Sequence, residues 1–182
     1  MFSHHGQITD LPIGYRFLPK DEELIDWYLR RKISNGLLPA DVIKDIDGSE
    51  LYGKHPKNVV DNISGHQKSW YFFTHHNEGY DEGENKGIRI VGDGIGFWRG
   101  IQAEDSISNS NGEVYASKTH WKYFEGPISK GKRTHWMMEE YRLRNNASTS
   151  TNGQERDQDQ DKLVLEWVLV RIRKGKIYRN SS

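Results

Sequence analysis

The stretch Gly94–Gly100, which reads Gly-Ile-Gly-Phe-Trp-Arg-Gly, holds the residues best suited to contact a ligand. Aromatic residues favour β-strands, and side chains alternate between the two faces along a strand. If Trp98 points into the core, Phe97 and Arg99 share the opposite face. A guanidinium beside an aromatic ring suits a phosphate or a base edge. The same pattern also fits an ordinary strand on which Arg99 is merely solvated.

Further cations lie in the C-terminal part of the chain. Residues 61–115 contain four Lys or Arg against nine Asp or Glu, a net charge of −5, whereas residues 116–182 contain fourteen against eight, a net charge of +6. This asymmetry is compatible with a basic face near the C-terminus, and charge scattered over solvated loops is the alternative. The net charge of the whole chain is zero at pH 7 and gives no sign of nucleic-acid binding.

Catalytic and metal-binding patterns are missing from the sequence. No G-x-S-x-G motif or phosphate-binding loop is present, and the run Gly92–Phe97 lacks the last glycine of a dinucleotide-binding motif. There is no cysteine, and no tight ligand spacing relates the histidines His66, His75, His76, His120 and His135. We therefore expect no enzyme activity, no metal site and no cofactor.

Membrane and secretion signals are also missing. The N-terminus has no apolar run of the kind found in secretory signals, and no stretch approaches the roughly 18 apolar residues of a membrane span. We therefore expect no membrane partner.

One helix and several strands are expected to position these residues. The helix runs from Asp21, its proposed cap, to about Lys32, with leucine, isoleucine and tyrosine repeating at a spacing of four. Strands are expected at 70–73, 114–124, 134–143 and 163–172. Residues 106–112 are expected to form a loop, residues 1–10 a flexible arm, and residues 145–162 a disordered loop because they are almost purely polar.

The segment Leu11–Leu24 reads LPIGYRFLPKDEEL and resembles the opening block of the plant NAC domain, roughly LPPGFRFHPTDEEL. Trp70–Phe73 resembles the family's WYFF, Thr134–Leu143 its TDWVMHEYRL, and the run ending at Ile172 its DWVLCRI. The resemblance implies one domain over residues 11–176, followed by a tail at 177–182. It implies an α+β fold, in which a twisted antiparallel β-sheet is packed between a few helices, and short strands with polar loops fit that fold independently.

The opening block builds the dimer interface in this family, where an arginine forms a salt bridge with a glutamate on the partner's first helix. Those positions match Arg16 and Glu23, and an intrachain or solvated pair is the alternative. The dimer residues that the resemblance implies are Leu11, Pro12, Gly14, Tyr15, Arg16 and Glu23.

The family's DNA-contacting strand, close to GYWKATGKDK, corresponds here to the divergent GFWRGIQAED of Gly96–Asp105. Arg99 stands at the first lysine, but Ala103 replaces the second and Glu104 adds a carboxylate, so phosphate affinity should be weaker. The resemblance implies a set of DNA-contacting residues, namely Arg89, Phe97, Arg99, Lys118, Lys122, Lys130, Lys132 and Arg133.

The resemblance therefore implies a nuclear, sequence-specific transcription regulator that binds double-stranded DNA, with CACG as the core element. The chain is expected to form homodimers, or heterodimers with other NAC-domain proteins. The alternative function is a NAC-like interaction and dimerisation module whose DNA binding is weak or lost, because the DNA-contacting strand departs from the family pattern.

Overall fold

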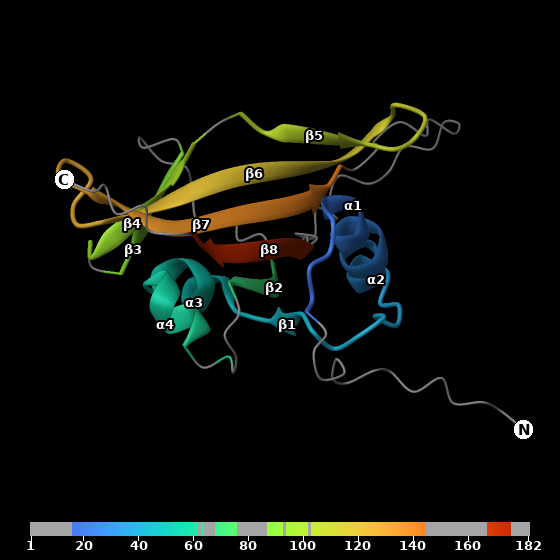
Figure 1. The fold of residues 1–182 in the computed structure, drawn as a ribbon, viewed down its shortest axis with the longest axis horizontal. Coiled ribbons are helices and arrows are strands. Elements are labelled where there is room, and N and C mark those ends of the chain that lie inside the picture. The colour runs from blue at the N-terminus through green and yellow to red at the C-terminus, as the bar shows by residue number, and fades with distance from the viewer. Residues whose placement is uncertain are drawn as a thin grey trace, which may run out of the picture.

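The computed structural model of the chain describes residues 16–61, 63, 68–75, 87–92, 94–101, 103–144 and 167–175, in which eight strands form one sheet (Figure 1). The helical segments are α1 (Asp21–Glu23), η1 (Leu24–Leu29), α2 (Arg30–Ile33), α3 (Gly48–Gly53) and α4 (Pro56–Val60). The strands are β1 (Lys44–Asp45), β2 (Ser69–His75), β3 (Ile88–Val91), β4 (Gly96–Gly100), β5 (Asp105–Ser108), β6 (Val114–Glu125), β7 (Lys132–Leu143) and β8 (Trp167–Lys174).

The strand order in the sheet is β1-β2-β8-β7-β6-β4-β3, and β5 pairs with β6 beyond the end of β4. Every pair is antiparallel except β1 with β2, which is parallel. The long strands β6 and β7 are twisted around each other and form the middle of the sheet (Figure 1). The expected α+β fold, a twisted sheet between a few helices, is confirmed, and the parallel pair β1–β2 is the one departure from the expected antiparallel sheet.

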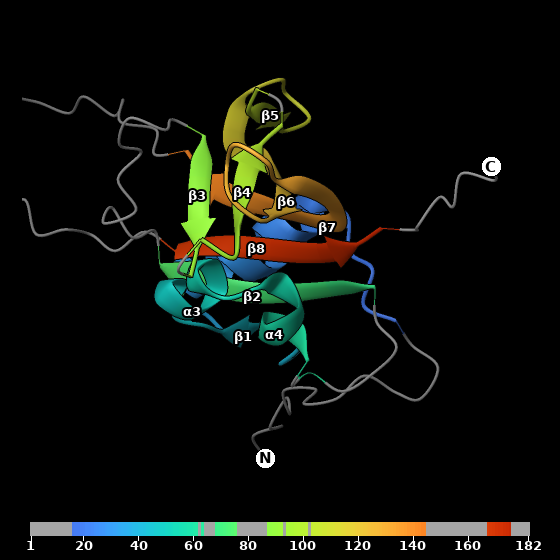
Figure 2. The ribbon, with the colours of Figure 1, turned by 90° about the vertical axis from the view of Figure 1, so that its left-hand side faces the viewer.

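Both faces of the sheet are covered, because alternate residues of the central strands are apolar on both sides. Trp70 and Phe72 of β2 join one core cluster with the side chains of α3 and α4, while Tyr71 and Phe73 join another with those of η1. Figure 2 shows α3 and α4 in front of the sheet and the segment from α1 to α2 behind it. The aromatic run of the strand expected at 70–73 therefore packs against both helical layers.

The helix expected from Asp21 to Lys32 is present as α1, η1 and α2 in succession. Its middle turn is π-helical, since the N–H of Arg30 donates to the carbonyl of Ile25. Asp21 is not the cap as expected, because the helix begins at Asp21 and Lys20 precedes it. The carboxylate of Asp21 instead accepts hydrogen bonds from the sheet, from Lys118 Nζ at 2.7 Å and Tyr141 Oη at 2.8 Å.

The expected loop at 106–112 is partly wrong. Asp105–Ser108 forms strand β5 along β6, with Ile107 partly buried against the core under η1. The rest of the expected loop contains a turn at Ser110 and Asn111, and Gly112 has a φ of 80°, a conformation that favours glycine. The partly buried Ile107 stabilises the strand.

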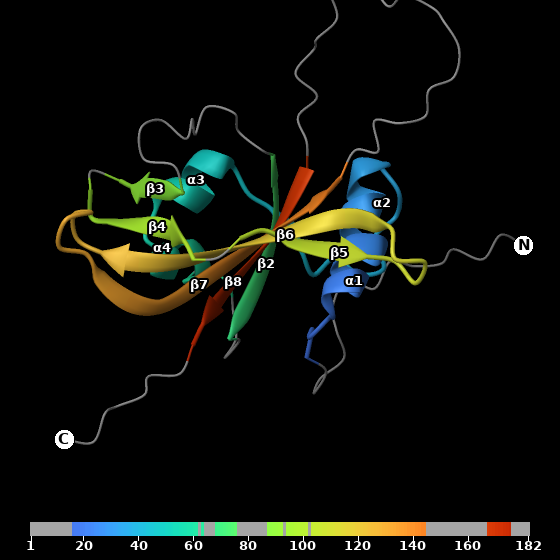
Figure 3. The ribbon, with the colours of Figure 1, turned by 90° about the horizontal axis from the view of Figure 1, so that it is seen from above.

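The sheet has two distinct ends. Figure 3 shows β3, β4 and the turn between β6 and β7 at one end, and α1 and α2 at the other. The expected arm at 1–10, loop at 145–162 and tail at 177–182 lie outside the described residues, as do residues 163–166 of the last predicted strand.

Candidate nucleic-acid interface

Five cations gather at the end of the sheet that carries β4 and the turn between β6 and β7. Strand register places Arg99 of β4 opposite Lys122 of β6, and it places Arg133 and Lys132 of β7 opposite the last two residues of β6. Lys130 lies in the turn that joins β6 to β7. We call this set, Arg99, Lys122, Lys130, Lys132 and Arg133, the basic edge.

The turn from Gly126 to Gly131 is held by backbone hydrogen bonds. Gly126 has a φ of 92°, and its N–H donates to the carbonyl of Ile95 at 2.9 Å, which ties the turn to the start of β4. The N–H of Lys130 donates to the carbonyl of Pro127 at 3.0 Å. The turn therefore keeps Lys130 beside the strand that carries Arg99.

The basic edge is open to solvent and lacks counter-charges. All its members are exposed except Lys122, which is partly buried, and among the described residues no carboxylate forms an ion pair with any of them. The neighbouring carboxylate of Glu125 is directed to His55 on another element, 3.2 Å from its Nε2. Unpaired cations at one surface attract phosphate groups, because they neutralise the backbone charge of a nucleic acid.

Phe97 does share a face with Arg99, as expected, because the Arg99 guanidinium carbon lies 5.2 Å from the centre of the Phe97 ring. The expectation that Phe97 faces a DNA groove is corrected, since its side chain is only 1% exposed. The ring is covered by Phe124 and the turn at Gly131. Phe97 therefore lies beneath Arg99 and is not a surface contact in this arrangement.

Arg89 on β3 is placed in an interior ion pair rather than at the surface. Its guanidinium donates twice to Glu140, at 2.5 and 3.3 Å, and lies over the rings of Tyr52 and Trp121. Burial alone would raise the pKa of Glu140, but the charge and hydrogen bonds of Arg89, with help from Arg142 and Tyr52, hold it below its ordinary value. In this arrangement Arg89 is occupied by a carboxylate and does not join the basic edge.

Lys118 on β6 is likewise paired, at the other end of the sheet. Its ammonium lies 2.7 Å from Asp21 and 3.7 Å from Glu139, and its side chain is 13% exposed. Burial would raise the pKa of Asp21, but hydrogen bonds from Lys118 and Tyr141 and the charge of Arg171 lower it. Lys118 therefore links helix α1 to the sheet through its ion pair with Asp21, and it is not placed for a phosphate contact.

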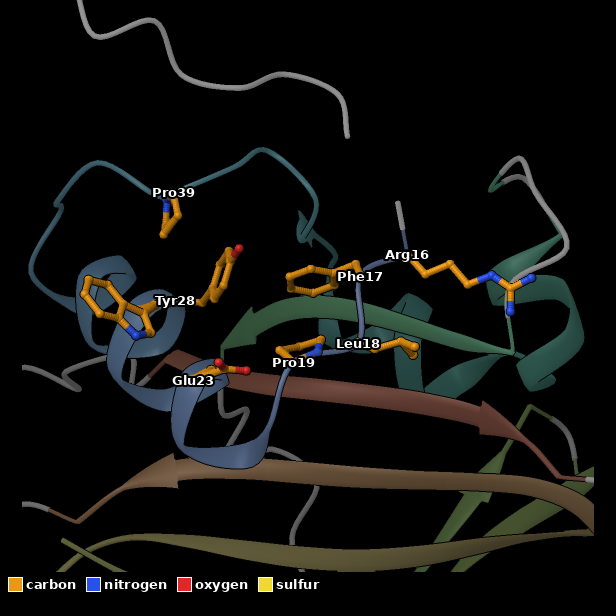
Figure 4. A pocket seen from close by; sticks show the side chains of 8 residues that line it. Arg16, Phe17, Leu18, Pro19, Glu23, Tyr28 and Pro39 are labelled. Atoms are coloured by element: carbon orange, nitrogen blue, oxygen red, sulfur yellow. The ribbon is translucent and has the colours of Figure 1, made fainter. Parts of the chain in front are cut away.

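An apolar groove of about 420 Å³ lies at the helical end, next to the expected dimer residues Arg16 and Glu23 (Figure 4). Leu18 and Trp27 line it with 72% and 52% of their surfaces exposed. Figure 4 shows Arg16 directed away from Glu23, whose carboxylate accepts from the N–H of Lys20 at 2.8 Å. The two residues form no ion pair within the chain, and the other expected dimer residues, Leu11, Pro12, Gly14 and Tyr15, lie outside the described residues.

Sequence reasoning missed two neighbours of the basic edge. Phe124 stacks on Phe97, and Arg173 lies on the same cross-strand row as Lys122, separated from it by Met137. Arg173 donates to the buried Glu139 at 2.5 Å. Finding either one would have required the register of β6, β7 and β8, which no short motif encodes.

Two other kinds of feature are not found among the described residues. Among them no three His, Cys, Asp or Glu side chains are arranged to hold a metal ion. None of their helices has the length and apolar character needed to cross a bilayer.

Comparison with known proteins gives a consistent result. A family model described as "No apical meristem (NAM) protein" matches residues 12–143. NAC domain-containing protein 101 of Arabidopsis thaliana is 32% identical over 173 residues, which cover 93% of this chain and 44% of that protein. NAC domain-containing protein 71 of Oryza sativa subsp. japonica is 32% identical over 177 residues, covering 96% and 51%. NAC transcription factor 29 of Arabidopsis thaliana is 32% identical over 168 residues, covering 91% and 58%. The chain spans about half the length of these relatives.

Proposed function

Because the chain belongs to the NAC domain family, we propose that it is a transcription regulator of the plant NAC type that binds double-stranded DNA as a dimer. Its place of action in this proposal is the nucleus, and it has no catalytic activity. The names of two relatives include the words transcription factor, which agrees with this function.

The basic edge is the observation that carries the DNA-binding proposal. Arg99 and Lys122 come from neighbouring strands, while Lys130, Lys132 and Arg133 come from the turn and the start of β7. Lys and Arg side chains at one surface supply phosphate affinity, and an arginine can also read a guanine edge in the major groove. We assign Arg99 to a base edge, and we assign the lysines and Arg133 to phosphates.

The apolar groove supports the proposal of a dimer. A second copy related by a two-fold axis would cover Leu18 and Trp27 and bring its Glu23 to Arg16 of the first copy. Arg16 has no partner among the described residues, so its guanidinium is available for a bidentate pair with a carboxylate. The partner is a second copy of this chain or another NAC-domain protein.

A second candidate function is a NAC-like interaction module with weak or lost DNA binding. The segment that follows β4 favours this alternative, because Ala103 carries no charge and Glu104 and Asp105 are exposed carboxylates. An added negative charge on this segment, such as that of Glu104, repels phosphates and reduces the affinity for any duplex.

The deciding experiment is fluorescence anisotropy of the chain on a duplex with a CACG core and on a scrambled duplex, at several salt concentrations. We expect tighter binding to the core and a log–log salt slope of about −0.9 for each contacted phosphate. Lys130→Ala should reduce the slope by about one contact on both duplexes. Lys44→Ala is the matched control, because Lys44 is exposed on β1 at the opposite edge of the sheet.

Equal and weak binding of both duplexes by the wild-type chain would contradict the DNA-binding proposal. It would favour the interaction module, and titration of the chain with labelled NAC domains would then be the next measurement. An unchanged slope for Lys130→Ala would remove that residue from the phosphate contacts.

A further inference from the structure

Two phenylalanine rings lie side by side on the face of the sheet that carries Arg99. Phe97 of β4 and Phe124 of β6 are register partners, and their rings are stacked with centres 5.2 Å apart and planes 4° apart. The guanidinium carbon of Arg99 lies 5.2 Å from one ring centre and 5.1 Å from the other. The cation therefore lies equally over both rings and not over one of them.

The turn that bears Lys130 rests on the same rings. A Cβ atom at Gly131 would lie 2.5 Å from Cε1 of Phe97 and 3.3 Å from Cβ of Phe124, so only glycine lets the backbone approach this closely. Lys130 and Lys132 flank that glycine in the sequence. The position of the rings thus sets the position of the turn as well as that of Arg99.

Stacking on aromatic rings has a particular effect on an arginine. The ring faces attract the guanidinium and restrict the conformations of its long side chain, while the five N–H donors remain free in the guanidinium plane. A lysine ammonium in the same place lacks the planar set of N–H donors whose orientation the rings could fix. A guanidinium fixed in this way meets a base edge with less loss of conformational freedom than a freely moving one.

We propose that Phe97 and Phe124 are positioning residues that hold the Arg99 guanidinium in the orientation for a base edge of duplex DNA. Through Gly131 the same two rings align the lysines of the turn with Arg99. The inference rests on the proposed DNA-binding function. It adds that discrimination between sequences depends on two side chains that need not touch the DNA.

The first test compares the affinity ratio between the CACG duplex and the scrambled duplex for four variants. Arg99→Ala, Arg99→Lys and Phe124→Leu should each lower the ratio at least about fivefold, the low end of what one bidentate base contact contributes. Phe124→Leu should leave the salt slope unchanged, because it removes no charge. Phe72→Leu is the matched control, since that ring is buried under the other face of the sheet, and its ratio should equal the wild-type ratio.

The second test needs no DNA. In the free chain the two rings should shift the NMR resonances of the Arg99 side chain upfield through their ring currents, and Phe124→Leu should move them back toward values typical of a solvated arginine. Phe124 is only partly buried, so this variant is milder than a change at Phe97, and circular dichroism shows whether it folds. Gly131→Ala should also change these resonances, because the added methyl group displaces Phe97.

The outcomes separate the inference from the proposed function. If the wild-type chain and Phe124→Leu discriminate equally well while Arg99→Ala does not, positioning by the rings is overturned and DNA binding stands. If the wild-type chain binds both duplexes equally, the proposed function is overturned, and with it the base-edge role of the rings. If the Arg99 resonances of the wild type are those of a solvated side chain, the stacking of Arg99 on the two rings is itself overturned.

Discussion

Two carboxylates, the buried Glu140 and the partly buried Asp21, are paired with cations that lie far away in the sequence. Glu140 is paired with Arg89, which is 51 residues distant, and Asp21 with Lys118, which is 97 residues distant. The Arg89–Glu140 pair is costly to break, because the Glu140 carboxylate would stay buried without its closest cation. Arg89 and Lys118, which were expected to contact DNA, therefore contribute to the stability of the fold in this structure.

The first prediction concerns Arg89→Ala. This change leaves the Glu140 carboxylate buried without its guanidinium and should lower the free energy of unfolding by about 3–5 kcal/mol. Urea unfolding measures the loss, with Arg99→Ala as an exposed arginine control that should change stability by only about 0.5 kcal/mol. The double variant Arg89→Met, Glu140→Met should recover most of the stability. An unchanged midpoint for Arg89→Ala would show that the pair is not formed in solution.

The second prediction concerns acid stability. The pKa of Glu140 is held below its ordinary value of 4.5, so its contribution to stability is complete above that pH and is lost as the pH falls through the lower folded-state value. Unfolding free energies between about pH 5 and about pH 3 should therefore fall less steeply in Glu140→Gln than in the wild type. Glu113→Gln, which changes an exposed carboxylate, is the control, and identical slopes in all three chains would contradict the assignment.

At the scale of an element, β4 depends on one glycine for its pairing with β6. A Cβ atom at Gly96 would clash with Tyr123 and would come within 2.6 Å of the carbonyl oxygen of Phe124. Tyr123 is fully buried, and burial, followed by the charge of Glu125, raises its pKa to about 12, so it stays neutral. The close approach explains why the strand that carries Arg99 begins with a glycine.

The third prediction follows from this contact. Gly96→Ala should destabilise the chain by about 1–3 kcal/mol, the usual cost of inserting a methyl group into a filled space. Gly100→Ala at the other end of β4 is the control, because its nearest neighbour would lie at an ordinary 3.7 Å. Thermal unfolding of the two variants provides the comparison. Equal midpoints would mean that the backbones of β4 and β6 separate easily at Gly96.

Several helices and strands could be predicted from the sequence, but the contacts between distant elements could not. The helix at 21–33 and the strands β2, β6 and β7 follow from local apolar periodicity, which decides which face each side chain occupies. Register between strands depends on segments that are distant in the sequence. Local patterns therefore could not predict the partners of Arg89 and Lys118 or the stacking of Phe124 on Phe97. Strand β5 was missed because a segment of small polar residues gives almost no apolar signal.

At the scale of the whole molecule, the two proposed interfaces lie at opposite ends of the sheet. The basic edge is at the end with β4, and the apolar groove is beside the helix that begins with α1 (Figure 3). A partner bound in the groove therefore leaves the basic edge uncovered. Dimerisation and DNA binding can occur together without competing for surface.

The fourth prediction tests the groove as a dimer surface. Arg16→Glu should convert the chain to a monomer in light scattering, because two carboxylates would then face each other across the two-fold axis. Glu23→Arg should do the same, and the double variant Arg16→Glu, Glu23→Arg should restore the dimer mass by exchanging the charges. A double variant that remains monomeric would contradict pairing between these two residues.

The outer strands of the sheet are short: β1 has two residues, while β3 and β5 have four each. An exposed strand edge is a template on which another polypeptide can add by backbone hydrogen bonding, and long flat edges promote aggregation. Short edges on a twisted sheet give an incoming strand few places to bind. The long strands β6 and β7 would be the longest templates, but both lie in the interior of the sheet, where β6 pairs with β7, β4 and β5, and β7 pairs with β6 and, over Trp136–Tyr141, with β8. The architecture thus protects the chain from edge-to-edge assembly into fibrils, even though isoleucines such as Ile90 on β3 are half exposed.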